Sequence, residues 1–88
     1  MIYSTAMKYK LKFQIYGIPE NGDLAVFEVD LSRSITTDAL MPIMAWHEEE
    51  DAMASYLLSA RQVTAIENLA MIVLPKELML YLSSYEEP

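Results

Sequence analysis

The fold of this chain is decided by Lys8–Leu31, which has the sequence KYKLKFQIYGIPENGDLAVFEVDL. Apolar and polar residues alternate strictly at its start and more loosely over Leu24–Leu31, which is typical of strands with one buried face. Side chains in a strand point alternately to opposite faces. One face of a β-hairpin is therefore predicted to form the floor of the core, and its first strand contributes Tyr9, Leu11, Phe13 and Ile15.

The turn between these strands determines their register. The Asn-Gly pair at 21–22 favours a two-residue type I′ turn, which would place Phe13 opposite Asp30. A three-residue loop with Gly22 in the left-handed conformation would instead place Phe13 opposite Val29. Because a slip of one residue moves every side chain to the other face, burial of one face favours the three-residue loop.

Length and composition indicate one small domain. With 88 residues, 53% of them hydrophobic, the chain can bury a modest core and does not have the composition of a disordered protein. We expect a lead-in segment over residues 1–6 and a single domain over 7–88, since Met7 is also a plausible start. The absence of cysteine excludes a disulfide framework or thiolate metal site and is consistent with a cytoplasmic protein. No apolar run reaches the roughly 18–20 residues of a membrane span.

The net charge of −7 is distributed unevenly. All thirteen acids follow residue 19, where only Arg33, Arg61 and Lys76 oppose them. Nucleic acid and anionic lipid bind mainly through cationic side chains, so this composition argues against both as partners. It favours a basic protein as the partner, although solubility alone also explains an acidic surface.

Two helices are predicted after the hairpin. The first spans 37–46, with Thr37 as its cap and Asp38 in its first turn. Pro42 lies within it, so this helix either bends there or begins at Pro42. The second spans 60–69 and begins at a capping box formed by Ser59 and Gln62.

The C-terminal run is compatible with two structures. Pro75 and an apolar stripe that ends at Tyr85 favour a helix, whereas alternating leucines over Leu78–Leu82 favour a strand. We predict a strand, because a two-stranded hairpin alone is marginally stable in water. Residues 71–75 are expected to be extended. The predicted fold is α+β: a small antiparallel sheet, made of the N-terminal hairpin and a C-terminal strand, with two helices packed on one face.

No motif for catalysis is present. His47 lies beside Glu48, but the chain has no second histidine, and the spaced ligands and turn glycine of a calcium loop are missing. Nucleophile motifs and a glycine-rich phosphate loop are also missing. We therefore expect neither enzymatic activity, nor a cofactor, nor a bound metal.

The segment Ser55–Gln62, with Leu69 and the Tyr81-Leu82 pair, resembles small acidic bacterial immunity proteins. These are the partners of polymorphic and contact-dependent growth inhibition toxins. Relatives are expected to carry Tyr-Pro-Leu-Thr/Ser here, whereas this chain has Leu57 in place of the proline. The resemblance extends over about residues 7–86. It implies a non-enzymatic protein that neutralises a cognate toxin by tight binding, with its acids covering a basic nuclease surface.

The candidate partner-binding residues lie in the acidic connection between the helices. In this hypothesis four carboxylates pair with lysine and arginine, while one aromatic residue anchors the contact. Trp46 has a second interpretation as a hydrophobic lid over the sheet, and the tyrosines as half-buried packing residues. The candidates are Trp46, His47, Glu48, Glu49, Glu50, Asp51 and Tyr56.

An alternative is a self-associating structural or regulatory subunit. Such a subunit would use an exposed strand edge or the Leu78–Leu82 face. Under the first hypothesis the partner is a toxin domain, and the protein itself is a monomer or weak homo-oligomer.

Overall fold

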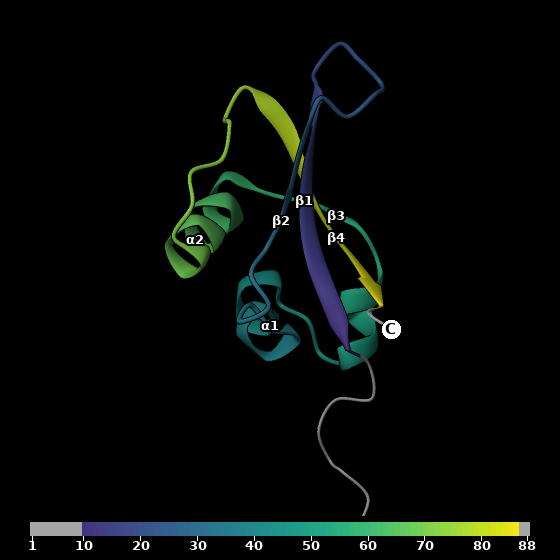
Figure 1. The fold of residues 1–88 in the computed structure, drawn as a ribbon, viewed down its shortest axis with the longest axis vertical. Coiled ribbons are helices and arrows are strands. Elements are labelled where there is room, and N and C mark those ends of the chain that lie inside the picture. Colours follow the sequence, from purple (N-terminus) through teal and green to yellow (C-terminus); the bar gives the residue numbers. More distant parts are fainter. Residues whose placement is uncertain (1–9, 87–88) are drawn as a thin grey trace, which may run out of the picture.

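The computed structural model describes residues 10–86 and confirms the α+β prediction (Figure 1). Four antiparallel strands form one sheet in the order β2-β1-β4-β3. The predicted lead-in over residues 1–6, and Tyr9, lie outside the described residues. The elements are β1 (Leu11–Pro19), β2 (Phe27–Asp30), α1 (Thr37–Met44), the 3-10 helix η1 (Glu49–Met53), β3 (Tyr56–Leu57), α2 (Ala60–Ala70) and β4 (Leu78–Glu86).

The two central strands are the first and the last. β1 and β4 pair along their whole length, from Leu11 opposite Glu86 to Pro19 opposite Leu78. The C-terminal segment is therefore a strand, as predicted, and the helical alternative is wrong. The short strand β3 was not predicted; its two residues pair with Leu82 and Tyr81.

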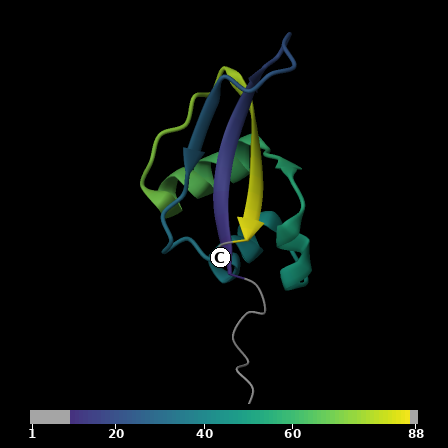
Figure 2. The same cartoon turned by 45° about the vertical axis from the view of Figure 1, so that its right-hand side comes forward.

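The core lies on the face of the sheet that the helices cover. The predicted floor is confirmed there: Phe13 and Ile15 are fully buried, and Leu11 packs against them. Figure 2 shows α2 crossing behind the strands, while the front face of the sheet is not covered by a helix. The other buried apolar residues are Leu31, Ile35, Leu40, Met44, Trp46, Ala52, Leu58, Val63, Ile66, Leu74, Leu80 and Leu82.

The hairpin register differs from the prediction by two residues. Ile15 lies opposite Val29, and Gly17 lies opposite Phe27, whereas the three-residue loop placed Phe13 opposite Val29. A shift of two keeps each side chain on its own face, so the predicted faces are correct although the pairs are wrong. Burial of one face excludes a register that is shifted by an odd number of residues, because every side chain would change face. It cannot choose between registers that differ by an even number of residues.

The connection between β1 and β2 is longer than predicted. The N–H of Gly22 donates to the carbonyl oxygen of Pro19 (3.0 Å), and the backbone φ of Gly22 is not positive. β2 begins at Phe27 rather than Leu24. Leu24 and Val26 are 75% and 65% exposed, so burial of their side chains does not hold this part of the chain in the ladder.

Replacing Gly22 with alanine tests this turn directly. The nearest atoms to an added Cβ belong to Pro19 at 3.5 Å, which is ordinary contact. Alanine should therefore stabilise the fold by about 0.4–1 kcal/mol, because it restricts the unfolded chain without straining the folded one. Urea denaturation of the variant and the wild type measures the difference. A destabilised variant would indicate the left-handed conformation of the three-residue loop.

The first helix begins at Thr37 as predicted, but its cap and its end differ from the prediction. Its cap is Thr36 rather than Thr37: the Thr36 hydroxyl accepts the N–H of Ala39 (3.2 Å). The helix continues through Pro42, so the alternative in which it begins there is wrong. It ends at Met44 instead of 46, and Ala45 closes it in the left-handed conformation with φ of 59°.

The second helix confirms the predicted capping box. The Ser59 hydroxyl accepts the backbone N–H of Gln62 (3.2 Å), while the side-chain amide oxygen Oε1 of Gln62 accepts the backbone N–H of Ser59 (2.9 Å). Val63 and Ile66 on this helix are buried against the sheet. The helix extends one residue beyond the predicted end, to Ala70.

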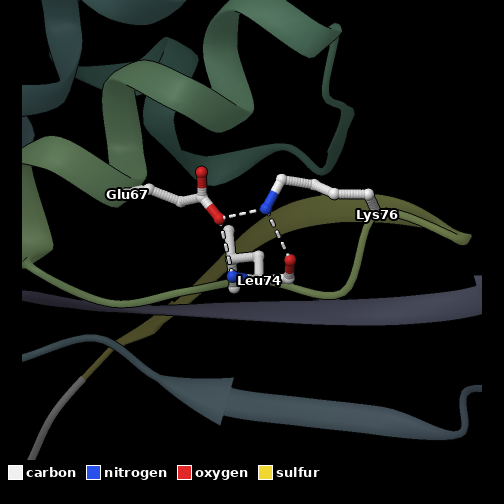
Figure 3. A network of polar contacts seen from close by, with 3 residues as sticks. All are labelled: Glu67, Leu74 and Lys76. Atoms are coloured by element: carbon white, nitrogen blue, oxygen red, sulfur yellow. Dashed lines mark hydrogen bonds and ion pairs between the residues drawn. The ribbon is translucent and has the colours of Figure 1, made fainter.

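A polar network connects α2 to the start of β4 (Figure 3). The Glu67 carboxylate accepts the N–H of Leu74 (2.7 Å) and forms an ion pair with Lys76. The Lys76 ammonium also donates to the carbonyl oxygen of Leu74 (2.7 Å). The bond from Lys76 and then the bond from the Leu74 N–H to the Glu67 carboxylate lower the pKa of Glu67. They hold residues 71–75, which were expected to be extended, in an irregular conformation.

Candidate functional site

The predicted acidic connection forms a compact turn rather than an open loop. We call His47–Asp51 the acidic turn; it leads from the end of α1 into η1. The Asp51 carboxylate accepts the backbone N–H groups of His47 (2.9 Å) and Glu48 (3.2 Å). Asp51 thus caps its own turn. Like charges that would repel one another in a longer helix are held here within a single turn of backbone.

Two further hydrogen bonds attach η1 and the acidic turn to the sheet. The Tyr56 hydroxyl donates to the carbonyl oxygen of Asp51 (2.6 Å), and the Ser84 hydroxyl donates to that of Ala52 (2.6 Å). Tyr56 belongs to β3 and Ser84 to β4, and Ala52 itself is buried. The turn is therefore braced on the helix-covered side of the sheet, beside the end of β4 (Figure 1).

The structure separates the seven predicted site residues into two groups. Trp46 is only 7% exposed, and its ring lies 6.2 Å from Phe13 and 5.7 Å from Tyr56. It is a core residue that closes the end of α1 onto the sheet, so the lid interpretation is confirmed and the exposed anchor is wrong. Tyr56 is half-buried, and its hydroxyl is used by the turn.

The second group consists of the outward side chains. His47, Glu48 and Glu50 are exposed, and Glu49 is half-buried. Among residues 10–86, no ion pair connects these glutamates to a lysine or arginine. Asp51 differs from them, because its carboxylate is already used by backbone N–H groups. The role of all four carboxylates in partner binding stays a prediction, but the structure distinguishes Asp51, which also caps the turn, from Glu48, Glu49 and Glu50.

The role of Asp51 predicts a specific pH dependence of stability. The backbone bonds from His47 and then Glu48 lower the pKa of Asp51 below its usual 3.8. A lowered folded-state pKa contributes stability that is present above the unfolded pKa and is lost as the pH falls through the folded pKa. Asp51→Asn keeps an oxygen acceptor but removes the charge. Its melting temperature should therefore lie below that of the wild type near neutral pH and converge with it in acid.

Asp51→Ala is the matched control for this prediction. It removes the acceptor as well as the charge, and we expect it to lower the melting temperature by about 4–8 °C near neutral pH. Unlike Asp51→Asn, it should remain less stable than the wild type in acid, where a protonated Asp51 can still accept a hydrogen bond. Circular dichroism melts from about pH 7 to about pH 2 measure all three proteins. A gap between the wild type and Asp51→Asn that is constant with pH would contradict the capping role.

A cavity of about 400 Å³ lies away from the acidic turn, between α2 and the start of β4. Its lining is mostly aliphatic, and its one charged group, Lys76, is paired with Glu67. Within residues 10–86, no group of three histidine or acidic side chains could hold a metal ion. The cavity is lined by Leu57, Leu58, Ala60, Val63, Thr64, Lys76, Leu78, Met79 and Leu80.

The uncovered face of the sheet carries an arrangement that sequence reasoning missed. Tyr16 and Tyr81 are cross-strand partners on β1 and β4, and their rings stack at 5.1 Å with an angle of 9° between the planes. The sequence indicated half-buried tyrosines but could not pair them, because the two residues are far apart in the chain. Only the β1–β4 register would have identified the pair.

No family model, curated protein or solved structure matches this chain. In the described part of the chain, no helix is both long and apolar enough to cross a membrane.

Proposed function

We propose that this protein is a non-enzymatic immunity protein that binds and neutralises a basic toxin domain, such as a nuclease, in the cytoplasm. The acidic turn is its primary contact. Glu48, Glu49 and Glu50 form ion pairs with lysine and arginine of the toxin, while Asp51 and Tyr56 hold the turn in place. Trp46 stabilises the fold from the core and does not contact the toxin.

The preorganised turn is the observation that carries this proposal. Three adjacent carboxylates stand on backbone that is fixed by bonds to Asp51, Tyr56 and Ser84. A partner that binds a preordered segment does not have to order it, which favours affinity. Described basic residues of this chain do not neutralise these carboxylates. They therefore remain available to an external cation.

The overall charge supports the same partner. At −7, the protein attracts a basic domain over distances of the order of the Debye length, about 8 Å at physiological salt. Electrostatic complementarity raises association rates more than it raises the intrinsic affinity of the docked complex. Fast capture suits an inhibitor that must act before the toxin reaches its substrate.

The test requires the partner first. We expect a basic protein, in equal amount, to co-purify with this chain from its native cell. Changing Glu48, Glu49 and Glu50 together to glutamine should then slow association with that protein at least tenfold and weaken the salt dependence. The melting temperature should change little, because Asp51 remains as the cap. Stopped-flow association at two ionic strengths and a thermal melt measure both effects.

A matched variant separates a specific contact from net charge. Glu20→Gln, Asp23→Asn and Glu77→Gln remove the same number of carboxylates, all of them exposed, from positions outside the acidic turn. This triple variant should retain most of the association rate. An equal loss in both triple variants would reduce the proposal to long-range attraction, and no loss in the acidic turn variant would exclude that turn as the interface.

A further inference from the structure

One row of cross-strand partners runs over all four strands on the face of the sheet opposite the helices. Figure 2 shows that no helix of residues 10–86 covers this face. Tyr16 on β1 is the partner of Glu28 on β2 and of Tyr81 on β4, and Tyr81 is in turn the partner of Leu57 on β3. Both tyrosines are half-buried, Glu28 is exposed, and Leu57 is 58% exposed. Acidic, aromatic and aliphatic side chains therefore lie side by side on a face that no described helix covers.

The stacked rings are suited to one kind of ligand group. Stacking on Tyr81 occupies one face of the half-buried Tyr16 ring, and the other face is the one that a further planar group would use. Glu28 comes next in the same row on that side. Cations are attracted to the face of an aromatic ring, and arginine adds planar stacking and a fork of donors that matches a carboxylate.

The next row adds a second carboxylate on the same strand. Asp30 is the partner of Gln14, whose side-chain amide approaches it at 3.4 Å, and the Tyr85 hydroxyl approaches it at the same distance. These contacts are long, so Asp30 retains acceptor capacity. Among the described residues, the lysines that share this face by strand alternation are Lys10, just before β1, and Lys12, near its start; both lie beyond the Asp30 row. The charge around the stacked tyrosines is therefore negative.

We propose that this face, centred on Tyr16 and Tyr81 and bordered by Glu28 and Asp30, docks an arginine-bearing segment of a protein partner. The guanidinium lies on the Tyr16 ring and pairs with Glu28, while Leu57 packs against the aliphatic stem of the partner's side chain. The inference rests on the proposed function only in that the partner is a basic protein. It uses the sheet face opposite the acidic turn. Single-stranded nucleic acid also stacks on tyrosines, but the two carboxylates disfavour its phosphates.

Two short peptides test this surface on the full chain without the toxin. Hexa-arginine and hexa-lysine carry equal charge, but only arginine offers a planar cation. Titration of isotope-labelled protein with each peptide, followed by nuclear magnetic resonance, locates binding residue by residue. Hexa-arginine should shift the amide signals of Tyr16, Glu28 and Tyr81 and bind there at least severalfold more tightly than hexa-lysine. Shifts confined to the acidic turn, or equal binding of both peptides, would overturn the proposal.

Variants of the pair distinguish stacking from charge. Tyr16→Thr with Tyr81→Thr should weaken hexa-arginine binding about fivefold, whereas Tyr16→Phe with Tyr81→Phe should retain it, because phenylalanine keeps the ring face. Glu28→Gln tests the carboxylate without disturbing the rings. If both tyrosine double variants bind like the wild type, the stacked pair is not the site. Binding of oligothymidylate at this face would also contradict the proposal. Glu48, Glu49 and Glu50 are unchanged in all these variants, so failure here leaves the acidic turn proposal standing.

Discussion

Replacing Trp46 with alanine should lower the free energy of unfolding by about 3–5 kcal/mol, the usual cost of deleting a large aromatic side chain from a core. The ring of Trp46 lies between Phe13 on β1 and Tyr56 on β3, so its loss opens a cavity where α1 meets the sheet. Urea denaturation followed by far-ultraviolet circular dichroism measures the change. For a domain of this size, such a loss can leave the chain largely unfolded at 37 °C.

Trp46→Phe is the control that separates core packing from partner contact. The indole Nε1 of Trp46 is buried and has no hydrogen-bond partner among residues 10–86. Phenylalanine removes that unsatisfied donor and keeps an aromatic ring, so the loss should be below about 2 kcal/mol. If Trp46→Ala kept its stability but lost partner binding, Trp46 would be an exposed anchor after all.

Replacing Leu82 with alanine should cost about 2–5 kcal/mol, the range for large aliphatic residues in a core. Leu82 lies in β4 between Ile15 of β1 and Tyr56 of β3, and it is 1% exposed. Few neighbours can move into the space, because both flanking strands are held by backbone hydrogen bonds. Leu57→Ala is the matched control: this side chain is exposed, so its truncation should change stability by less than about 0.5 kcal/mol.

The same pair of variants tests the alternative of self-association. That hypothesis used an exposed strand edge or the Leu78–Leu82 face. Leu80 and Leu82 are buried in the core, so the strand edge is the part of the hypothesis that remains. Light scattering of the wild type and of Leu82→Ala measures the oligomeric state beside the stability. A Leu82→Ala variant that stays folded but dissociates from an oligomer formed by the wild type would show that the Leu78–Leu82 face takes part in self-association. If the wild type and Leu82→Ala are both monomers and the variant is less stable, the result supports the position of Leu82 in the core.

Local patterns predicted those parts of the fold that depend on neighbouring residues. The capping box of Ser59 and Gln62 and the alternation through Phe13 and Ile15 are signals within a few residues of each other, and both are confirmed. The hairpin register and β3 were missed for a common reason. Both are decided by pairing with another strand, and Tyr56–Leu57 is too short to have a periodicity of its own.

The sequence identified the residues of the acidic cluster, but it did not show how their roles differ. The sequence located the acidic cluster, but four adjacent acids look equivalent until the backbone is folded. Asp51 differs from Glu48 only because the turn directs two N–H groups at its carboxylate. Trp46 next to charged residues resembled an exposed anchor, yet the left-handed residue Ala45 ends α1 and precedes a tryptophan that packs in the core.

The pairing of β1 with β4 also determines when this chain can fold during its synthesis on the ribosome. One edge of β1 pairs with β2, which follows it closely in the chain, but its other edge pairs with residues 78–86. Until those residues leave the exit tunnel, β1 lacks its longest strand pairing, and the core lacks the buried side chains of Leu80 and Leu82. Folding of the domain is therefore expected to wait until translation of β4 is complete, and a nascent chain stalled before Leu78 should be sensitive to protease.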